Sequence, residues 1–265
     1  MHLPGHDFPF GLTRITGLSG PHTKMNMDFA VLRLADGSDY VNNSDRERAY
    51  LLVYGTVRFE WDGLVEVATR FNCFDENPWV LHVPASVAVC ITGVGADSEI
   101  TCHAAENTEP FAPRLYTQKD CRSEERGKGT MKETSTRIVR TVFDYTNAPF
   151  ARLVIGEVID FPGKWSSYPP HHHPQPEIYY YKFNPRGGFG YCEQGDAVVK
   201  VRHNSTALIE PGMTHPQATA PGYAMWYLWV ICHLPGNPYI QPTFLPEHLW
   251  ATEPDAVFWP DKDDP

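Results

Sequence analysis

Short runs of alternating apolar and polar residues, separated by glycine and proline, recur along most of the chain. β-branched and aromatic side chains suit a half-buried pleated surface, and Asp-Gly pairs favour tight hairpins. The run 49–61 predicts two strands around a bend at Gly55, and Asp62-Gly63 then predicts a hairpin into 64–68. The first half therefore reads as an antiparallel β module whose strands are expected at 24–34, 49–61, 64–68, 79–83 and 86–94.

The second half repeats this pattern after a polar, charged stretch between residues 105 and 135, which predicts a linker. Its strands are expected at 136–142, 151–159, 178–183, 197–201, 207–209 and 223–232. The end of the chain is acidic and predicts a solvated tail. The predicted fold is all-β and mainly antiparallel, with an N-terminal domain at 1–120, a C-terminal domain at 121–250 and the tail at 251–265.

Composition narrows the class of protein without changing this picture. The 24 prolines, 20 glycines and 13% aromatic residues favour many short strands joined by turns. A formal net charge of −10 and the lack of a basic run argue against nucleic-acid binding, which needs clustered Lys and Arg. The N-terminus lacks the features of a secretory signal, and no apolar stretch approaches the roughly 20 residues that span a bilayer. We therefore expect a cytoplasmic protein.

The cysteines support the same compartment. They include no C-x-x-C pair, so neither a zinc finger nor a thioredoxin-like site is predicted. Scattered cysteines of this kind are typical of reduced, small apolar residues. They are Cys73, Cys90, Cys102, Cys121, Cys192 and Cys232.

The densest chemistry lies in residues 169–177, Pro-Pro-His-His-His-Pro-Gln-Pro-Glu, ahead of an aromatic strand. Side chains on a strand alternate between two faces, so His171, His173 and Glu177 share one parity. Tyr179 and Tyr181 follow on the same parity, whereas the histidine at 172 points away. The tyrosines are either ordinary barrel core or residues that contact a ligand.

A further histidine, His215, follows a Pro-Gly turn about 40 residues later. Three imidazoles and one carboxylate suit a first-row divalent ion and leave one or two positions open, as in a catalytic site. The alternative is that the histidine run forms an exposed polar loop. His203 is the main rival to His215 as the remaining ligand, although it lies in an evident turn.

The two halves also echo each other. Residues 79–88 and 206–215 share an apolar strand, a proline turn and a returning strand, and Ala88 falls where His215 sits. The first half has no H-x-H motif before its aromatic hairpin. The duplication therefore predicts two barrels of which only the second can hold a metal.

These motifs resemble the cupin signature, H-x-H-x3-4-E followed by P-G-x-x-H. Within the cupins, the chain is similar to the 5-deoxy-glucuronate isomerases of myo-inositol catabolism from about residue 45 to 240. The most specific segment is Trp-Ser-Ser-Tyr-Pro-Pro-His at 165–171, and further similarity lies at 179–181, 184–185, 211–216 and 220–228. The resemblance implies a bicupin of two jelly-roll barrels, the first one degenerate and without metal.

The same resemblance implies a metal-dependent aldose–ketose isomerase acting on 5-deoxy-glucuronate and a homo-oligomeric state. The ligand set itself accepts Zn, Mn, Fe or Ni. The expected residues are His171, His173, Glu177 and His215 for the metal, Glu177, Tyr179 and Tyr181 for catalysis, and Tyr168, Arg186, Gln217 and Tyr227 for the substrate.

Two departures from the family leave the substrate open. His172 stands where the family has a basic residue, and the spacer between His173 and Glu177 is closer to that of the 5-keto-4-deoxyuronate isomerases. A metal-dependent dioxygenase and a non-catalytic sugar-acid-binding bicupin are the alternatives. Arg137, Arg140 and Arg186 are candidates for the substrate carboxylate, because the guanidinium fork suits that group, but each is also a plausible surface charge.

Overall fold

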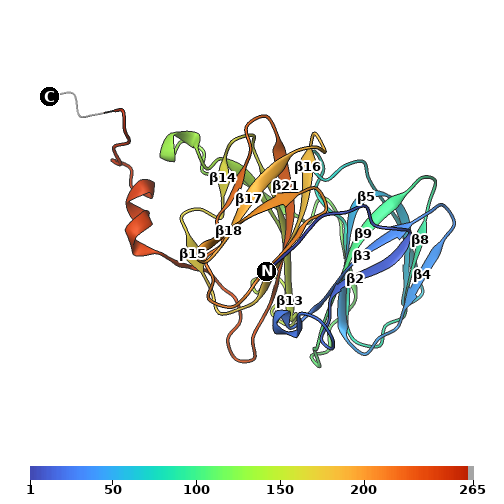
Figure 1. Cartoon of the computed structure of the whole chain (residues 1–265). Coiled ribbons are helices and arrows are strands. Elements are labelled where there is room, and N and C mark those ends of the chain that lie inside the picture. Colours follow the sequence, from blue (N-terminus) through green and yellow to red (C-terminus); the bar gives the residue numbers. More distant parts are fainter. Residues whose placement is uncertain (262–265) are drawn as a thin grey trace.

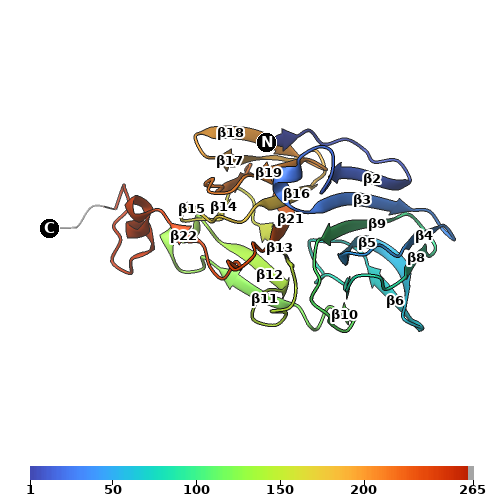
Figure 2. The same ribbon diagram turned by 90° about the horizontal axis from the view of Figure 1, so that it is seen from below.

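The computed structural model describes residues 1–261, and every pair of strands in it is antiparallel. Two β modules lie side by side (Figures 1 and 2), and we call them the N-terminal and the C-terminal barrel. The all-β, mainly antiparallel fold predicted from the sequence is confirmed. Residues 262–265, the end of the predicted acidic tail, lie outside the described residues.

The C-terminal barrel is built from a curled seven-stranded sheet, a four-stranded sheet and a two-stranded ribbon. The first sheet has the order β1 (His2–Leu3), β19 (Thr206–Ile209), β16 (Glu177–Asn184), β21 (Ala224–Cys232), β13 (Leu153–Asp160), β12 (Arg137–Phe143) and β11 (Arg122–Arg126). The second has the order β14 (Trp165–Ser166), β20 (Gln217–Thr219), β17 (Phe189–Gln194) and β18 (Ala197–Arg202). The ribbon pairs β15 (His171–His172) with β22 (Thr243–Phe244). Because β1 pairs with β19, the first residues of the chain belong to the second barrel's sheet.

The N-terminal barrel is a nine-stranded arrangement centred on the long strand β5 (Glu47–Trp61). This strand is continuous, whereas two strands were predicted, because it passes the bend with a register shift between Leu52 and Tyr54. Gly55 has φ +101° and lies against Ser98, so a side chain there would clash. The other strands are β2 (Gly11–Thr16), β3 (Asp28–Leu34), β4 (Asp39–Asn42), β6 (Leu64–Arg70), β7 (Val80–Val83), β8 (Val89–Gly93), β9 (Ser98–Ala105) and β10 (Arg114–Tyr116).

The predicted linker is wrong in part, because it contains two strands. β10 closes the N-terminal arrangement against β7, and β11 forms the edge of the seven-stranded sheet against β12. The five residues of β11 are all exposed, so their sequence carries no apolar alternation. The chain passes from one barrel to the other between these two strands.

The faces of β16 show how the barrels share their cores. Ile178 and Tyr180 belong to an apolar cluster that also contains Phe29, Leu51 and Val53 of the N-terminal barrel. Tyr179, Tyr181 and Phe183 point the other way, into the interior of the C-terminal barrel. The alternation predicted for this strand is therefore confirmed, and one face of β16 seals the junction while the other lines the barrel.

A buried ionic cluster ties the barrels together at the same junction. Glu157 on β13 is fully buried, and its Oε1 lies 2.5 Å from Arg70 Nη2 and 2.8 Å from Arg140 Nη1. Arg70 comes from β6 of the N-terminal barrel. Both guanidinium groups also donate to the backbone carbonyl of Glu76, at 2.7 Å in each case.

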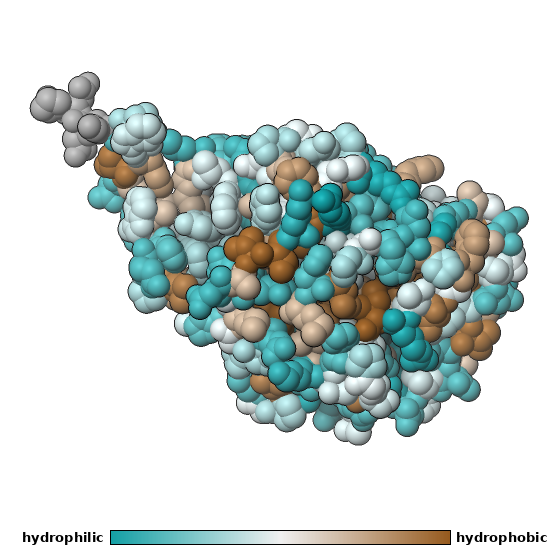
Figure 3. All heavy atoms as spheres, viewed as in Figure 1, coloured by the Kyte–Doolittle hydropathy of each residue, from teal (hydrophilic) through white to brown (hydrophobic). Residues whose placement is uncertain are grey.

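Three short 3-10 helices complete the described structure: η1 (Thr23–Met25), η2 (Met131–Glu133) and η3 (Pro246–Thr252). η3 and residues 253–261 extend away from the C-terminal barrel (Figure 1). No helix among residues 1–261 is long and apolar enough to cross a membrane. The face drawn in Figure 3 is mainly hydrophilic, with hydrophobic side chains in separate small groups.

Candidate metal centre

The predicted ligands are held by three structural elements that meet at one end of the C-terminal barrel. His171 lies in β15, which pairs with β22, and Glu177 is the first residue of β16. His215 follows the Pro-Gly turn between β19 and β20. The amide of Gly212 in this turn donates a 2.9 Å hydrogen bond to the carbonyl of His173, so the turn and the histidine loop are fastened to each other.

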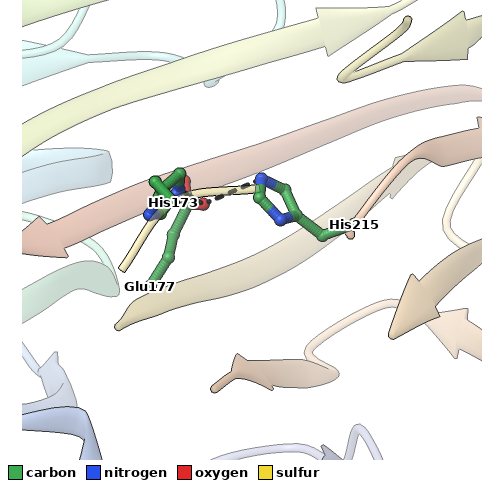
Figure 4. Close-up of side chains that lie close together, drawn as sticks. All are labelled: His173, Glu177 and His215. Carbon is green, nitrogen blue, oxygen red and sulfur yellow. Dashed lines mark hydrogen bonds and ion pairs between the residues drawn. The ribbon is translucent and has the colours of Figure 1, made fainter. Parts of the chain in front are cut away.

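Three of the four predicted ligands form a compact, buried group (Figure 4). Ligand atoms of His173, Glu177 and His215 all lie within 4.8 Å of one another. Glu177 Oε2 is 3.2 Å from His173 Nε2 and 3.4 Å from His215 Nε2. Each of the three side chains is almost completely inaccessible to solvent.

The hydrogen bonds of the imidazoles show that this group suits a cation. Nδ1 of His171, His173 and His215 lies 2.9, 2.9 and 2.8 Å from the backbone carbonyls of Pro169, Gln175 and Met213. A carbonyl can only accept, so each Nδ1 carries the proton and each neutral ring keeps its lone pair on Nε2.

Nε2 of His173 and Nε2 of His215 face the same carboxylate oxygen of Glu177, at 3.2 and 3.4 Å. A divalent ion bound between them would take these three atoms as ligands. Hydrogen bonds from the second ring nitrogen to carbonyl groups are also the usual support of metal-binding histidines.

His171 and His172 divide as the alternation predicts. His171 lines the same cavity as the group, and its ring centroid lies 4.8 Å from that of His215. Its nitrogen atoms are not within 4.8 Å of all three ligand atoms of the group, so in this geometry it stands at the edge. Burial and the neighbouring His215 lower the pKa of His171 to about 4, which leaves the ring neutral. His172 is half-buried and does not line the cavity.

Glu177 and Tyr179 form a polar pair on the inner face of β16. Burial alone would raise the pKa of Glu177, but the contact with His173 and the neighbouring His215 lower it below its usual range, which favours the carboxylate. The hydroxyl of Tyr179 donates to Glu177 Oε2 at 3.1 Å. Burial raises the pKa of Tyr179 well above its usual value, so this hydroxyl keeps its proton.

A cavity of about 500 Å³ opens onto these ligands. Its volume suits a small sugar acid, since ligand pockets start at about 300 Å³. Residues from β11, β12, β13, β21 and the loop 166–171 form its wall, and the segment 239–244 covers it. The aromatic and apolar side chains of this lining include Tyr239, Ile240, Phe244, Trp229 and Ile231.

The predicted substrate-binding residues separate into two groups. Tyr168 and Tyr227 line the cavity. Gln217 is fully buried behind it, where its Nε2 donates to the carbonyl of His215 at 2.7 Å and its Oε1 accepts from the hydroxyl of Tyr181 at 2.7 Å. Neither Tyr181 nor Gln217 lines the cavity, so both are placed to position His215.

Arg186, the remaining predicted substrate-binding residue, is away from the cavity. It is exposed, pairs with Asp7 and borders a separate hollow between the barrels. Of the other arginine candidates, Arg140 is buried in the ionic cluster and Arg137 lines the cavity. His203, the rival ligand, borders the same hollow as Arg186.

Several lining residues were not expected from the sequence. Ser166 and Ser167 lie within the segment 165–171, which was noted only for its resemblance to the family. Tyr239 is within contact of a ligand, with ring centroids 4.8 Å apart from His173, but the polar segment that carries it gave no signal.

Comparison with known proteins agrees with this geometry. The model of the KduI/IolB family matches residues 12–251. A protein of Halalkalibacterium halodurans named 5-deoxy-glucuronate isomerase is 25% identical over 264 residues, which covers 92% of this chain and 94% of the relative. One of the same name from Bacillus subtilis strain 168 is 27% identical and covers 86% and 88%.

Solved structures support the same fold. An IolB-like protein from Salmonella typhimurium superimposes with a TM-score of 0.83 at 22% identity, covering 94% of this chain and 98% of its own. A mutant of Bacillus subtilis oxalate decarboxylase gives a TM-score of 0.67 at 12% identity, covering 96% and 81%. Another structure of that decarboxylase is described by its Mn(II) centres. The bicupin architecture predicted from the sequence is confirmed by these likenesses.

Proposed function

Since the chain belongs to the KduI/IolB family, we propose that it is a metal-dependent aldose–ketose isomerase that converts 5-deoxy-glucuronate to 5-dehydro-2-deoxy-gluconate in myo-inositol catabolism. Relatives named 5-deoxy-glucuronate isomerase match this chain over most of their length. One observation supports metal dependence: Nε2 of His173 and Nε2 of His215 both face the carboxylate of Glu177. In both rings Nδ1 donates its proton to a backbone carbonyl.

The residues that would hold the ion are His173, Glu177 and His215, joined by His171 from the edge of the group. A divalent ion bound there, whether Zn, Mn, Fe or Ni, would act as a Lewis acid that polarises the substrate carbonyl. Isomerisation also needs a proton to move between the two carbons that carry the carbonyl and the adjacent hydroxyl. The chain must supply this transfer.

Glu177 and Tyr179 are the residues we assign to the proton transfer. The carboxylate faces the cavity and is ionised, so it can accept a proton, and the protonated hydroxyl of Tyr179 can donate one. Tyr168 and Tyr227 line the cavity and can orient the substrate hydroxyls. Tyr181 acts one layer further out, by holding Gln217 against the carbonyl of His215.

The covering segment 239–244 has a complementary role. Its aromatic and apolar side chains lie over the ligands, with Phe244 5.3 Å from His171 between ring centroids. Exclusion of water strengthens every charge interaction within the cavity and protects a reactive carbanion-like species from solvent protons.

The test uses metal-loaded protein, 5-deoxy-glucuronate and NMR detection of the product, with metal content measured in each variant. We expect His173→Ala and His215→Ala to lose bound metal and activity. His172→Ala is the matched control, because this neighbouring histidine does not line the cavity and should keep both. If the metal-loaded wild type gave no product and behaved like His173→Ala, the proposed function would be refuted.

The sister reaction on 5-keto-4-deoxyuronate is a second candidate, favoured by the short spacer between His173 and Glu177. Parallel assays with both uronates decide between them. Oxygen uptake with turnover would instead indicate a dioxygenase, and tight binding without conversion would indicate a non-catalytic sugar-acid-binding protein. We also propose that the protein is cytoplasmic and, by analogy with cupins, a homo-oligomer. Sedimentation of the purified protein tests the oligomeric state.

A further inference from the structure

Two arginines stand side by side in the wall of the cavity. Arg126 on β11 and Arg137 on β12 are opposite each other in the antiparallel register, and both line the cavity. Like charges directly opposite each other destabilise a strand pair. Arg126 pairs with Glu124 at 2.8 Å, so the charge that lacks a partner in this wall is that of Arg137.

Arg137 has no acidic partner of its own among residues 1–261, since no carboxylate oxygen there lies within 4.0 Å of its guanidinium. Its Nη1 donates to the carbonyl and the hydroxyl of Ser135 at 2.7 and 2.8 Å, and its Nη2 donates to the carbonyl of Tyr168 at 3.3 Å. These neutral acceptors fix the fork in place without compensating its charge. The hydrogen bond to the carbonyl of Tyr168 also ties Arg137 to the segment that leads into His171.

The nearby acids do not supply the missing charge. Asp160 is opposite Arg137 on β13, but it is fully buried and neither of its carboxyl oxygens has a hydrogen-bond partner in the described part of the chain. Burial raises the pKa of Asp160 well above its usual range, although Arg137 opposes this, so burial favours the neutral carboxyl. Asp144 lines the cavity too, but it already pairs with Arg122.

A row of hydroxyl groups connects the metal ligands with this side of the cavity. Tyr179, which donates to Glu177, lies 3.5 Å from Ser167, and Ser167 lies 3.4 Å from the hydroxyl of Tyr227. Tyr227 and Arg137 both line the cavity. Such a row can hydrogen-bond the hydroxyls of an extended sugar chain.

We propose that Arg137, with Arg126 beside it, binds the carboxylate of the substrate, while the carbonyl end of the same molecule lies at His173, Glu177 and His215. This inference rests on the proposed isomerase function and makes Arg137 the residue that selects sugar acids over neutral sugars. It selects Arg137 from the three arginine candidates, since Arg140 is buried in the ionic cluster and Arg186 lies outside the cavity.

The experiment compares 5-deoxy-glucuronate with 5-deoxy-glucose, which has a hydroxymethyl group in place of the carboxylate. Steady-state kinetics are measured for the wild type, Arg137→Met and Arg137→Lys, each with its metal content. Arg202→Met is the control, because Arg202 is exposed on β18 and does not line the cavity.

We expect Arg137→Met to lower kcat/KM for the acid by about 10- to 100-fold, mainly through KM, as for a lost hydrogen bond to a charged group. Its kcat/KM for the neutral sugar should stay within about twofold of the wild type. Arg137→Lys should recover part of the activity on the acid, since it restores the charge but not the fork. Arg202→Met should match the wild type on both sugars.

Equal losses on both sugars would show that Arg137 acts only on the structure, and an unchanged kcat/KM for the acid would show that the carboxylate binds elsewhere. A wild type that converts both sugars equally well would also overturn the inference while leaving the isomerase function intact. If the wild type converts neither sugar, the proposed function fails, and calorimetric binding of D-gluconate tests Arg137 separately. There, affinity at least about tenfold weaker in Arg137→Met supports the anion site, and equal affinity overturns it.

Discussion

The buried ionic cluster at the junction of the barrels allows a quantitative prediction for Glu157→Gln. The substitution keeps the size of the side chain and one oxygen that can accept from an arginine. It removes the only negative charge within 4.0 Å of Arg70 and Arg140 among residues 1–261, at a position with no exposed side-chain surface. The two buried guanidinium groups are then compensated only by neutral carbonyl groups, such as that of Glu76.

Breaking a buried ion pair by changing one partner costs about 3–5 kcal/mol, because the remaining charge stays in a low-dielectric site. Total stability is about 5–15 kcal/mol, so the loss is a large share of it. For a chain of this size about 1 kcal/mol shifts the Tm by roughly 2–4 °C, and we therefore expect a decrease of about 6–20 °C. Urea denaturation of the metal-loaded protein, followed by tryptophan fluorescence, measures the free energy of unfolding directly.

Glu60→Gln provides the control for this experiment. Glu60 pairs with Arg58 at 2.7 Å, but the side chains are 37% and 46% exposed. Water screens such a pair, and its loss should change the free energy of unfolding by less than about 1 kcal/mol. A Glu157→Gln protein that was as stable as Glu60→Gln would refute the view that this cluster fastens the two barrels together.

Two further substitutions probe the C-terminal barrel. Tyr181→Phe removes the hydroxyl that donates to Gln217 Oε1. We expect the affinity for metal, measured by competition with a chelator, to fall about tenfold, as for other groups that support a metal ligand. An unchanged affinity would contradict the positioning role of Tyr181. In the wild type, Asp160 ionises in the unfolded chain above a pH of about 4, whereas the raised pKa favours the neutral carboxyl in the folded protein. The wild type therefore loses stability as the pH rises, by up to about 1.4 kcal/mol per pH unit. Asp160→Asn lacks this loss and should gain stability relative to the wild type. Urea denaturation at pH 5 and pH 7 measures this difference, and an Asp160→Asn protein that loses stability instead would mean that the carboxylate is ionised and serves Arg137.

The sequence predicted strands best where one face of a strand is apolar and the other is not. β16 shows this well, because its alternate residues enter two different cores. β11 was missed for the opposite reason. All its residues are exposed, and it is a strand because it pairs with β12, a contact that local patterns do not record.

The same limit separates the predicted from the unpredicted parts of the site. His173 lies in the loop just before β16, and Glu177 is the first residue of that strand. The two residues are four positions apart, so their proximity follows from local geometry. Tyr239 was not predicted, because it reaches the cavity only where the chain returns after β21. Arg137 was one of three arginine candidates, and the curl of the seven-stranded sheet brings it to the cavity wall. Arg186 was a candidate because its guanidinium fork suits a carboxylate, but it borders the hollow that residues of both barrels line.

The interior of the N-terminal barrel explains why the described residues of two similar barrels contain a single candidate metal centre. This interior is an apolar cluster that includes Leu52, Phe59 and Ile91, and the described residues contain no group of potential metal ligands there. Three of the barrel's buried polar groups, Glu47, Arg70 and Glu99, bond to the C-terminal barrel instead. Glu47 at the start of β5 accepts from the amides of Arg152 and Leu153 at 2.6 and 3.2 Å, where the chain enters β13.

This filled barrel fixes the strands on which the cavity depends. β13 is held at its start by Glu47 and in its middle by the cluster around Glu157, and β16 is held by Tyr180, whose hydroxyl donates to Glu99 at 2.9 Å. Both strands keep their other faces free for the C-terminal barrel. A hollow barrel has fewer internal contacts than a filled one, so the ligands at its end need support from outside. We therefore infer that the first barrel contributes to catalysis by stiffening β13 and β16, even though no residue of it lines the cavity.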